Sequence, residues 1–316
     1  MYNISMQVEI PYLEYFGLSE KPFGMTPDPA FYYESKQHRE ALDCLTFFLA
    51  QREGFALIYG DVGSGKTTLS RIFIDSLGNK AYNTALILNP IMDEAEFIKE
   101  VLKELNVQNE QNIKKELYDT LKTFLLDEFA KGKETILVID EAQLISNEIL
   151  ELIRLISNIE TDKQKILHTI FFAQPEFIEK LRDKNMRHLS QRITVTYYIA
   201  PLSYSEVRSY IGYRLIKAGM KSNFDIKDNA VKLIHAASRG YPRLINYLCD
   251  RCLLLLYAQS KNVIDKRAVS KVLQEENIPL SSVRKKQEVN RSIMEIVLIM
   301  LNFFLILFIL NLLGIL

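Results

Sequence analysis

One segment of this chain, a strand-like apolar run that leads into a glycine-rich loop and then a helical pattern, most constrains its fold. The segment "FALIYGDVGSGKTTL" begins with apolar residues 55–59 and continues through Gly60 to Thr67, which fits the pattern G-x-x-x-x-G-K-[ST]. The apolar periodicity of "TTLSRIFIDSL" predicts a helix directly afterwards. Such a loop can curl its backbone N–H groups around phosphate oxygens, and the helix N-terminus favours the same anion. We therefore predict an α/β fold of the P-loop NTPase class.

Each residue of this loop has an expected role in binding ATP together with Mg²⁺. Lys66 is expected to bridge the β- and γ-phosphates, and the hydroxyl of Thr67 to bind Mg²⁺. The other residues of the segment that we expect to contact the nucleotide are Gly60, Asp61, Val62, Gly63, Ser64, Gly65 and Thr68. The alternative is a chance match in a loop that binds no nucleotide, but the flanking strand and helix argue against it.

A second strand-like run ends in two adjacent carboxylates. In "ETILVIDEAQ", Asp140 and Glu141 follow the apolar residues 135–139. A carboxylate at a strand's carboxyl end, beside the phosphate loop, is suited to anchor Mg²⁺ through water, and we assign this role to Asp140. Glu141 is then placed to orient or deprotonate the water that attacks the γ-phosphate. The alternative is an acidic pair that caps the helix beginning near Asn147.

Three more strand-like runs alternate with helical patterns. They are "TALILNP", "KILHTIFFAQPEF" and "ITVTYYIA", and helices are expected at 93–106 and 112–131. This alternation predicts a parallel sheet with helices on both faces and its ligand at the carboxyl ends of the strands. Gln174 ends one of these runs. It could hydrogen-bond the attacking water or cap the following helix.

After Pro201 the sequence predicts helices alone. "SYSEVRSYIGYRLIKAG" opens with Ser203 and Glu206 as a capping box and ends at Gly219. Three further helices are expected at 226–238, 242–259 and 265–274. Together these segments predict a small helical lid domain behind the α/β domain.

The charge balance and the cysteines restrict the possible partners. The 316 residues include 39 Lys plus Arg and 39 Asp plus Glu, so a nucleic acid or an anionic lipid would need a local patch. The 3 cysteines are too few for a disulfide framework, which fits a reducing compartment. Cys249 and Cys252 form a C-x-x-C inside a helical pattern, and we interpret them as buried helix residues rather than metal ligands.

Two arginines lie where they could contact the γ-phosphate. Arg243 follows "SRGYP" at the start of a helix and could reach the cleft between the two domains. Arg192, in "HLSQRI", precedes the last strand-like run and could reach the nucleotide of a neighbouring subunit as an arginine finger. Arg182 and Arg187 compete with Arg192 for this role. Surface salt bridges are the alternative for both proposed positions.

The last residues of the sequence are strongly apolar. Residues 296–316 are apolar except for Asn302 and Asn311, and this run has the length that a helix needs to cross a bilayer. The preceding "SSVRKKQEVNR" is basic, which predicts that the remainder of the chain lies on the cytoplasmic side. We expect a single-pass C-terminal anchor in the inner (cytoplasmic) membrane. A buried core helix is the alternative.

Taken together, these segments resemble the AAA+ ATPases of the general secretion pathway protein A (ExeA-like) family, whose relatives serve pilus (MSHA-type) biogenesis and exopolysaccharide loci. The resemblance extends from about Tyr12 to about Gln274. It includes the leader "YFGLSEKPFGMTPDPAFYYESKQHREAL" and the motifs "GFALIYGDVGSGKTTL", "LVIDEAQ", "AQPEFIEKL", "LSQRI" and "GYPRLINYLCDRCLLLLYA". Many relatives carry a glycine before the glutamine of "AQPE", which is absent here.

The resemblance implies a role for each site residue. The two Walker motifs are matched by Lys66, Thr67, Asp140 and Glu141, while Gln174 matches sensor 1, Arg192 the arginine finger and Arg243 sensor 2. Such modules work as rings, of the hexameric class, because the finger reaches another subunit's ATP. The leader is implied to shape the adenine pocket through Tyr33 and His38, although both could simply pack. Members tied to secretion often carry a peptidoglycan-binding domain after the membrane helix; this sequence has none, so direct cell-wall binding is not expected.

These inferences divide the chain into a leader (1–40), an AAA+ α/β domain (41–201), a helical lid domain (202–276), a basic linker (277–292) and a transmembrane helix (293–316). We expect an ATPase that drives or regulates assembly of a cell-envelope machine of the type II secretion, type IV pilus or DNA-uptake type, with an inner-membrane protein as its partner. The alternative is a DNA-binding regulator of the transposition-helper type. The balanced charge and the anchor make a nucleic-acid partner the less favoured interpretation.

Overall fold

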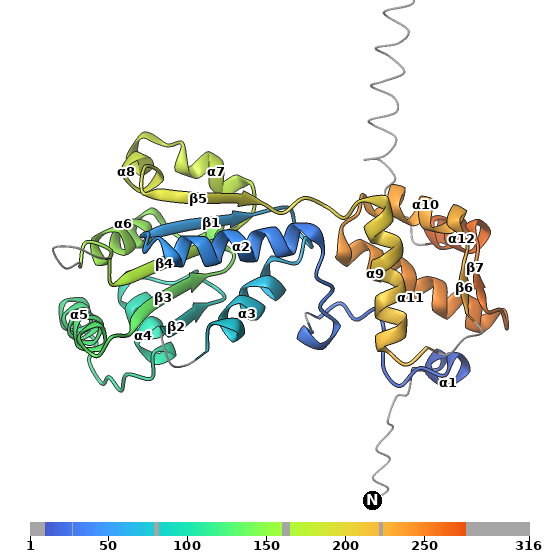
Figure 1. Cartoon of the computed structure of the whole chain (residues 1–316), viewed down its shortest axis with the longest axis horizontal. Helices are drawn as coiled ribbons and strands as arrows, with labels where there is room; N and C mark the ends of the chain where they lie inside the picture. The colour runs from blue at the N-terminus through green and yellow to red at the C-terminus, as the bar shows by residue number, and fades with distance from the viewer. Residues whose placement is uncertain (1–9, 27, 79–81, 160–164, 221–223, 276–316) are drawn as a thin grey trace, which may run out of the picture.

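The computed structural model describes residues 10–26, 28–78, 82–159, 165–220 and 224–275 (Figure 1). The predicted linker at 277–292 and the predicted transmembrane helix at 293–316 lie outside these residues. Among the helices in the described ranges, none combines the length and the apolar character needed to cross a membrane.

A parallel sheet of five strands forms the centre of the α/β part (Figure 1). Its strand order is β2-β3-β4-β1-β5. The strands are β1 (Phe55–Tyr59), β2 (Tyr82–Ile87), β3 (Glu134–Ile139), β4 (Leu167–Ala173) and β5 (Ile193–Tyr198). All strand pairs in this sheet are parallel, as the alternating sequence pattern predicted. In register, Tyr59 lies opposite Ala173 and Tyr198, so the segments that follow these strands leave the sheet at one edge.

Helices cover both faces of the sheet, because successive strand residues point to opposite sides. On β1, Phe55 and Leu57 enter one core cluster while Ala56 and Ile58 enter another. The first cluster lies under α4 (Glu94–Glu104), α5 (Lys114–Ala130), α6 (Asn147–Ile156), α7 (Glu176–Leu181) and α8 (Arg187–Ser190). The second lies under α2 (Lys36–Ala50) and α3 (Lys66–Leu77). Every residue of β4 is consequently buried.

The helical part contains α9 (Tyr204–Lys217), α10 (Asp228–Ser238), α11 (Pro242–Ala258) and α12 (Lys266–Glu275), which we call the helical domain. The predicted capping box of Ser203 and Glu206 is confirmed at the start of α9. Cys249 and Cys252 are buried on α11, in the core of this domain.

One expectation for the helical domain was wrong. The sequence predicted no strands after Pro201 and a helix from residue 226, but Asp225–Ile226 (β6) pairs in parallel with Val263–Ile264 (β7). The backbone N–H of Lys227 also donates to the carbonyl of Ile264 (3.0 Å), so α10 begins only at Asp228. A pair of strands this short carries no period that a sequence pattern could reveal.

The leader belongs in part to the core of the helical domain. Its buried aromatic residues Tyr12, Phe16, Phe23 and Phe31 pack with α9–α12. Tyr12 lies on α1 (Tyr12–Phe16), and its hydroxyl donates to Asp250 on α11 (2.5 Å). The chain then passes to α2 on the sheet and returns after β5 to α9, so it crosses between the two parts twice (Figure 1). The domain limits at residues 40, 201, 276 and 292 stay predictions.

Candidate active site

The phosphate loop is a tight turn between β1 and α3. Gly65 is the N-cap of α3 with a φ of 96°, and Gly63 has a φ of 79°, a region that L-residues with a Cβ rarely adopt. Neighbours also come close: a Cβ at Gly63 would lie 2.7 Å from the Cβ of Arg243, and one at Gly65 would lie 2.9 Å from Nε2 of His38. Glycine is therefore required at both positions by conformation and by space.

Lys66 is buried in the loop with its ammonium group facing backbone carbonyls. Its Nζ donates to the carbonyl oxygens of Gly60 (2.7 Å) and Asp61 (3.0 Å). Burial lowers the pKa of Lys66, while the nearby carboxylates of Glu141 and Asp140 act in the opposite direction. A buried cation held only by neutral oxygens is a strong attractor for an anionic ligand such as phosphate.

Two oxygen ligands suited to a magnesium ion meet beside this lysine. The hydroxyl of Thr67 donates to Oδ2 of Asp140 (2.5 Å), although 73 residues separate them in the sequence. Oδ1 of Asp140 accepts the backbone N–H of Glu141 (2.9 Å). Burial raises the pKa of Asp140, and the hydrogen bond from Thr67 opposes this shift. A hydroxyl and a carboxylate are hard oxygen donors of the kind that Mg²⁺ prefers, so these residues fit the ion.

Glu141 is held by two glutamine side chains. Its backbone is left-handed, with φ 50° and ψ 38°, which is uncommon for a residue other than glycine. Its Oε2 accepts from Nε2 of Gln143 (2.5 Å) and from Nε2 of Gln174 (3.0 Å). The Oε1 of Gln143 in turn accepts the backbone N–H of Gln174 (3.0 Å). Glu141 and Gln174, the predicted sensor residue, are thus joined both directly and through Gln143.

These contacts argue against the capping alternatives for the acidic pair and for Gln174, while their catalytic roles stay predictions. The helix α6 is capped by Ser146, not by Asp140 or Glu141. The side chain of Gln174 contacts Glu141, and α7 has no side-chain cap. Sequence reasoning did not identify Gln143, although it stands two residues after Glu141 in "DEAQ".

A cavity of about 310 Å³ extends from the loop to the helical domain. It is lined by the predicted nucleotide residues Val62, Gly63, Gly65, Lys66, Thr67 and Thr68 and by the predicted catalytic residues Glu141 and Arg243, but not by Gly60, Asp61, Ser64, Asp140 or Gln174. Its far end is lined by Tyr210, Arg214 and Asn246 of the helical domain together with the leader residues Gly24, Met25, Thr26, Asp28, Phe31, Tyr32 and Tyr33. The cavity thus has a loop end suited to phosphates and an aromatic end formed by the leader.

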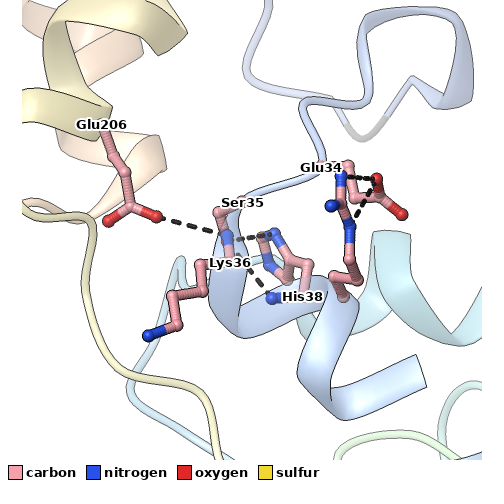
Figure 2. A network of polar contacts seen from close by, with 6 residues as sticks. Glu34, Ser35, Lys36, His38 and Glu206 are labelled. Carbon is pink, nitrogen blue, oxygen red and sulfur yellow. Dashed lines mark hydrogen bonds and ion pairs between the residues drawn. The ribbon is translucent and has the colours of Figure 1, made fainter. Parts of the chain in front are cut away.

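His38 connects the leader to the phosphate loop. Its side chain is 6% exposed, and Nε2 lies 3.0 Å from the carbonyl oxygen of Ser64, so this nitrogen donates. Nδ1 then accepts from the hydroxyl of Ser35 (3.1 Å). Figure 2 shows this pair beside Lys36, whose backbone N–H donates to Glu206 of α9 (3.3 Å). Burial lowers the pKa of His38, which favours the neutral imidazole that this arrangement needs.

A buried arginine that the sequence did not indicate joins the leader to the helical domain. Arg214 is 7% exposed and stacks on the ring of Phe31, with 4.9 Å between its Cζ and the ring centroid. Its Nε donates to the carbonyl of Pro22 (2.5 Å) and Nη1 to the hydroxyl of Tyr210 (2.9 Å). These contacts fix the aromatic end of the cavity. Tyr33, which the resemblance predicted to line the pocket together with His38, also lines this cavity.

Arg192 does not line this cavity. It precedes the first residue of β5, whereas the phosphate loop follows the last residue of the parallel neighbour β1. A strand of this length spans roughly 20 Å. Arg192 and the phosphate loop therefore lie at opposite ends of the strands. Nη1 of Arg192 donates to Asn158 (2.7 Å) and Ser157 (3.1 Å) at the end of α6. Its competitors Arg182 and Arg187 are both exposed.

Solved structures share this fold at low sequence identity. The Aeropyrum pernix ORC2 protein, in ADPNP-ADP complexes, superposes with a TM-score of 0.59 and 15% identity, covering 79% of this chain and 72% of that one. Cdc6p from Pyrobaculum aerophilum gives a TM-score of 0.60 and 17% identity, covering 79% of this chain and 71% of that one. At these identities the likeness shows the fold alone.

Sequence comparison is more informative about the family. Residues 49–181 match the model of the AAA domain family. General secretion pathway protein A of Aeromonas hydrophila is 38% identical over 254 residues, which cover 80% of this chain and 46% of that protein. This chain thus spans about half the length of that relative. The resemblance drawn from the sequence motifs is confirmed, and the chain belongs to the AAA+ ATPases of the general secretion pathway protein A-like family.

Proposed function

We propose that this chain binds ATP with Mg²⁺ in the cavity between the phosphate loop and the helical domain and hydrolyses it there. The observation that carries this proposal is the contact of Thr67 with Asp140 (2.5 Å) beside the buried Lys66. A hydroxyl, a carboxylate and an ammonium group gathered at the carboxyl edge of a parallel sheet are the parts that phosphoryl transfer needs.

Each residue contributes a separate step. Lys66 exchanges its contacts with the carbonyls of Gly60 and Asp61 for phosphate oxygens, and Thr67 and Asp140 are the residues that would hold the ion. When bound, Mg²⁺ neutralises charge that develops on the phosphates. Glu141 orients the attacking water and accepts its proton, with its carboxylate aimed by Gln143 and Gln174.

We further propose that the chain assembles into a ring of the hexameric class. Arg192 precedes β5, at the opposite end of the strands from its own loop, which supports a role on the nucleotide of another subunit. Arg243, by contrast, lines the chain's own cavity and serves as the sensor in the same subunit.

The cellular role that we propose is to drive or regulate assembly of a cell-envelope machine, of the type II secretion, type IV pilus or DNA-uptake type. The likeness to General secretion pathway protein A supports this class of process. In this proposal residues 293–316 anchor the chain in the inner membrane, the ATPase part lies in the cytoplasm, and the partner is an inner-membrane protein. The equal numbers of basic and acidic residues, 39 each, favour such a partner over nucleic acid.

The Glu141→Gln variant tests the proposed chemistry. Glutamine keeps the shape of the side chain but cannot accept the proton, so ATP should still bind while turnover falls by roughly 10²- to 10⁴-fold. Phosphate release and binding of a fluorescent ATP analogue measure the two properties. Glu110→Gln, an exposed acid in the loop before α5, is the matched control and should behave as wild type.

Two results would contradict this function. Unchanged turnover in Glu141→Gln removes the base assignment. Failure of the wild-type protein to bind ATP with Mg²⁺ at any protein concentration overturns the proposal itself.

A further inference from the structure

One carboxylate of the phosphate loop accepts hydrogen bonds from both parts of the molecule. Oδ2 of Asp61 accepts from the hydroxyl of Tyr241 (2.5 Å) and from the hydroxyl of Tyr198 (2.9 Å). Tyr198 is the last residue of β5, and Tyr241 is the N-cap residue of α11 in the helical domain. Asp61 therefore joins the loop to the sheet through one phenol and to the helical domain through the other.

Tyr241 stands directly before the turn of α11 that carries Arg243. The carbonyl of Tyr241 accepts the backbone N–H groups of Leu244 and Ile245 (both 3.0 Å), so its backbone is part of that first turn. Pro242 occupies the first helical position, where its fixed φ stiffens the start of the helix. A displacement of Tyr241 is thus transmitted to Arg243 with little loss.

The first turn of α11 and the loop also touch directly. A Cβ at Gly63 would lie 2.7 Å from the Cβ of Arg243, which is closer than real Cβ contacts come. Arg243 also lines the cavity that Lys66 and Thr67 line, so its guanidinium is carried into position by this first turn. The distance between the first turn of α11 and the phosphate loop therefore determines where the Arg243 guanidinium lies relative to a terminal phosphate.

We propose that Asp61 and Tyr241 are positioning residues whose hydrogen bond holds the first turn of α11 against the phosphate loop and so keeps Arg243 at the γ-phosphate end of the cavity. The inference rests on the proposed ATP binding and deepens it, because it names what sets the sensor arginine. The inference also gives the side chain of Asp61 a function in addition to the nucleotide contact that its place in the phosphate loop predicts.

The chemistry of the pair suits a permanent contact. The acceptor is a carboxylate, and hydrogen bonds to charged groups are roughly twice as strong as those between neutral ones. Burial and the bond to Asp61 raise the pKa of Tyr241, so its hydroxyl remains a donor at physiological pH. The backbone carbonyl of Asp61 accepts from Lys66 (3.0 Å), so one residue links the lysine that meets phosphate to the helix that carries Arg243.

The Tyr241→Phe variant of the full chain tests this inference through binding rather than turnover. Affinities for fluorescent analogues of ATP and ADP are measured with Mg²⁺, and their ratio is compared with that of wild type. Because only ATP offers a γ-phosphate to Arg243, the preference for ATP should fall about fivefold to tenfold while ADP affinity stays unchanged. Tyr198→Phe removes the bond that the same oxygen accepts from the sheet but keeps its bond from Tyr241, and it should keep the wild-type ratio.

A double-mutant cycle separates positioning from general weakening. If Tyr241 acts through Arg243, the variant with both Tyr241→Phe and Arg243→Ala should show the same ratio as Arg243→Ala alone. Additive losses overturn the inference, and so do equal losses of ATP and ADP affinity or an equal effect of Tyr198→Phe. Thermal unfolding checks that each variant is folded. Wild-type protein that binds neither nucleotide contradicts the proposed function, whereas normal binding with an unaffected Tyr241→Phe contradicts this inference alone.

Discussion

His38 shows how one residue can make the phosphate loop sensitive to pH. Its Nε2 must carry a proton to donate to Ser64, and its Nδ1 must lack one to accept from Ser35. Burial lowers the pKa of His38 below its ordinary value of about 6.5. Between the folded and the unfolded pKa, the unfolded chain binds more protons than the folded one. The stability that the neutral imidazole contributes is therefore present above about pH 6.5 and is lost as the pH falls from there.

The His38→Gln variant should consequently respond less to acid. We expect the wild-type free energy of unfolding to fall by up to about 1.4 kcal/mol for each pH unit between 6.5 and the lowered pKa of folded His38, a loss that the variant lacks. Urea denaturation at pH 7.5 and 5.5 measures the difference. His188→Gln, at an exposed position, should keep the wild-type pH dependence. Parallel curves for wild type and His38→Gln would show that His38 is not the responsible group.

The sequence predicted the residues of the site where they are local to a motif. Lys66 and Thr67 were assigned because their neighbours define a loop, and Asp140 because a strand pattern ends beside it. Tyr241 could not be assigned, because its partner Asp61 is 180 residues away. Arg214 was missed for the same reason, since its contact with Pro22 spans 192 residues. Contacts of this kind follow from how the two parts pack and leave no periodic signal in the sequence.

At the scale of elements, burial decided what the sequence could predict. The strands β1, β3 and β4 are buried on both faces and read as largely apolar runs, so their positions were predicted correctly. The strands β6 and β7 of the helical domain were not predicted, because each has only two residues. The leader's aromatic residues also gave no sign that they complete the core of a domain nearly 200 residues later.

The turn between α10 and α11 depends on a glycine for space. Gly240 has a φ of 80°, and a Cβ there would lie 2.1 Å from the carbonyl oxygen of Leu202. Its own carbonyl accepts the backbone N–H of Leu202 (3.0 Å), which ties α11 to the segment before α9. The clash cannot be relieved by a side-chain rotation, because the obstacle is backbone.

We therefore expect Gly240→Ala to destabilise the helical domain strongly. Gly132 has a similar φ of 83° with nothing near its Cβ position, so Gly132→Ala reports the strain of the backbone alone. That strain costs about 1–2 kcal/mol, and the contact with Leu202 should add on the order of 3 kcal/mol. Urea denaturation of the two variants measures both values. Equal losses of stability in the two variants would mean that the backbone near Leu202 shifts at no cost to accommodate the new Cβ at position 240.

For the whole molecule, the position of Arg192 makes a prediction about subunits. An Arg192→Ala ring should bind ATP normally but turn it over about 10³-fold more slowly, because the finger stabilises the transition state. Lys66→Ala subunits should bind no nucleotide yet still present Arg192. A mixture of the two inactive variants should therefore regain part of the activity, as measured by phosphate release.

Variants of Arg182 and Arg187, the two competitors for the finger role, test the same assignment. Arg187→Ala and Arg182→Ala should leave turnover unchanged if Arg192 is the finger. A mixture that stays inactive, although the two variants associate, would show that Arg192 does not act between subunits.

The chain crosses between the α/β part and the helical domain twice, once after the leader and once after β5. Two covalent attachments leave the parts free to rotate about the line that joins them, but they oppose sliding or complete separation. Phe31 of the leader lines the cavity and packs in the core of the helical domain, where it stacks against Arg214. The aromatic wall of the cavity must then swing as one body with α9 and α11. Widening of the site at the start of α11 consequently requires the hydrogen bond between Tyr241 and Asp61 to break, whereas the contacts of Arg214 with Pro22 and Tyr210 can stay intact.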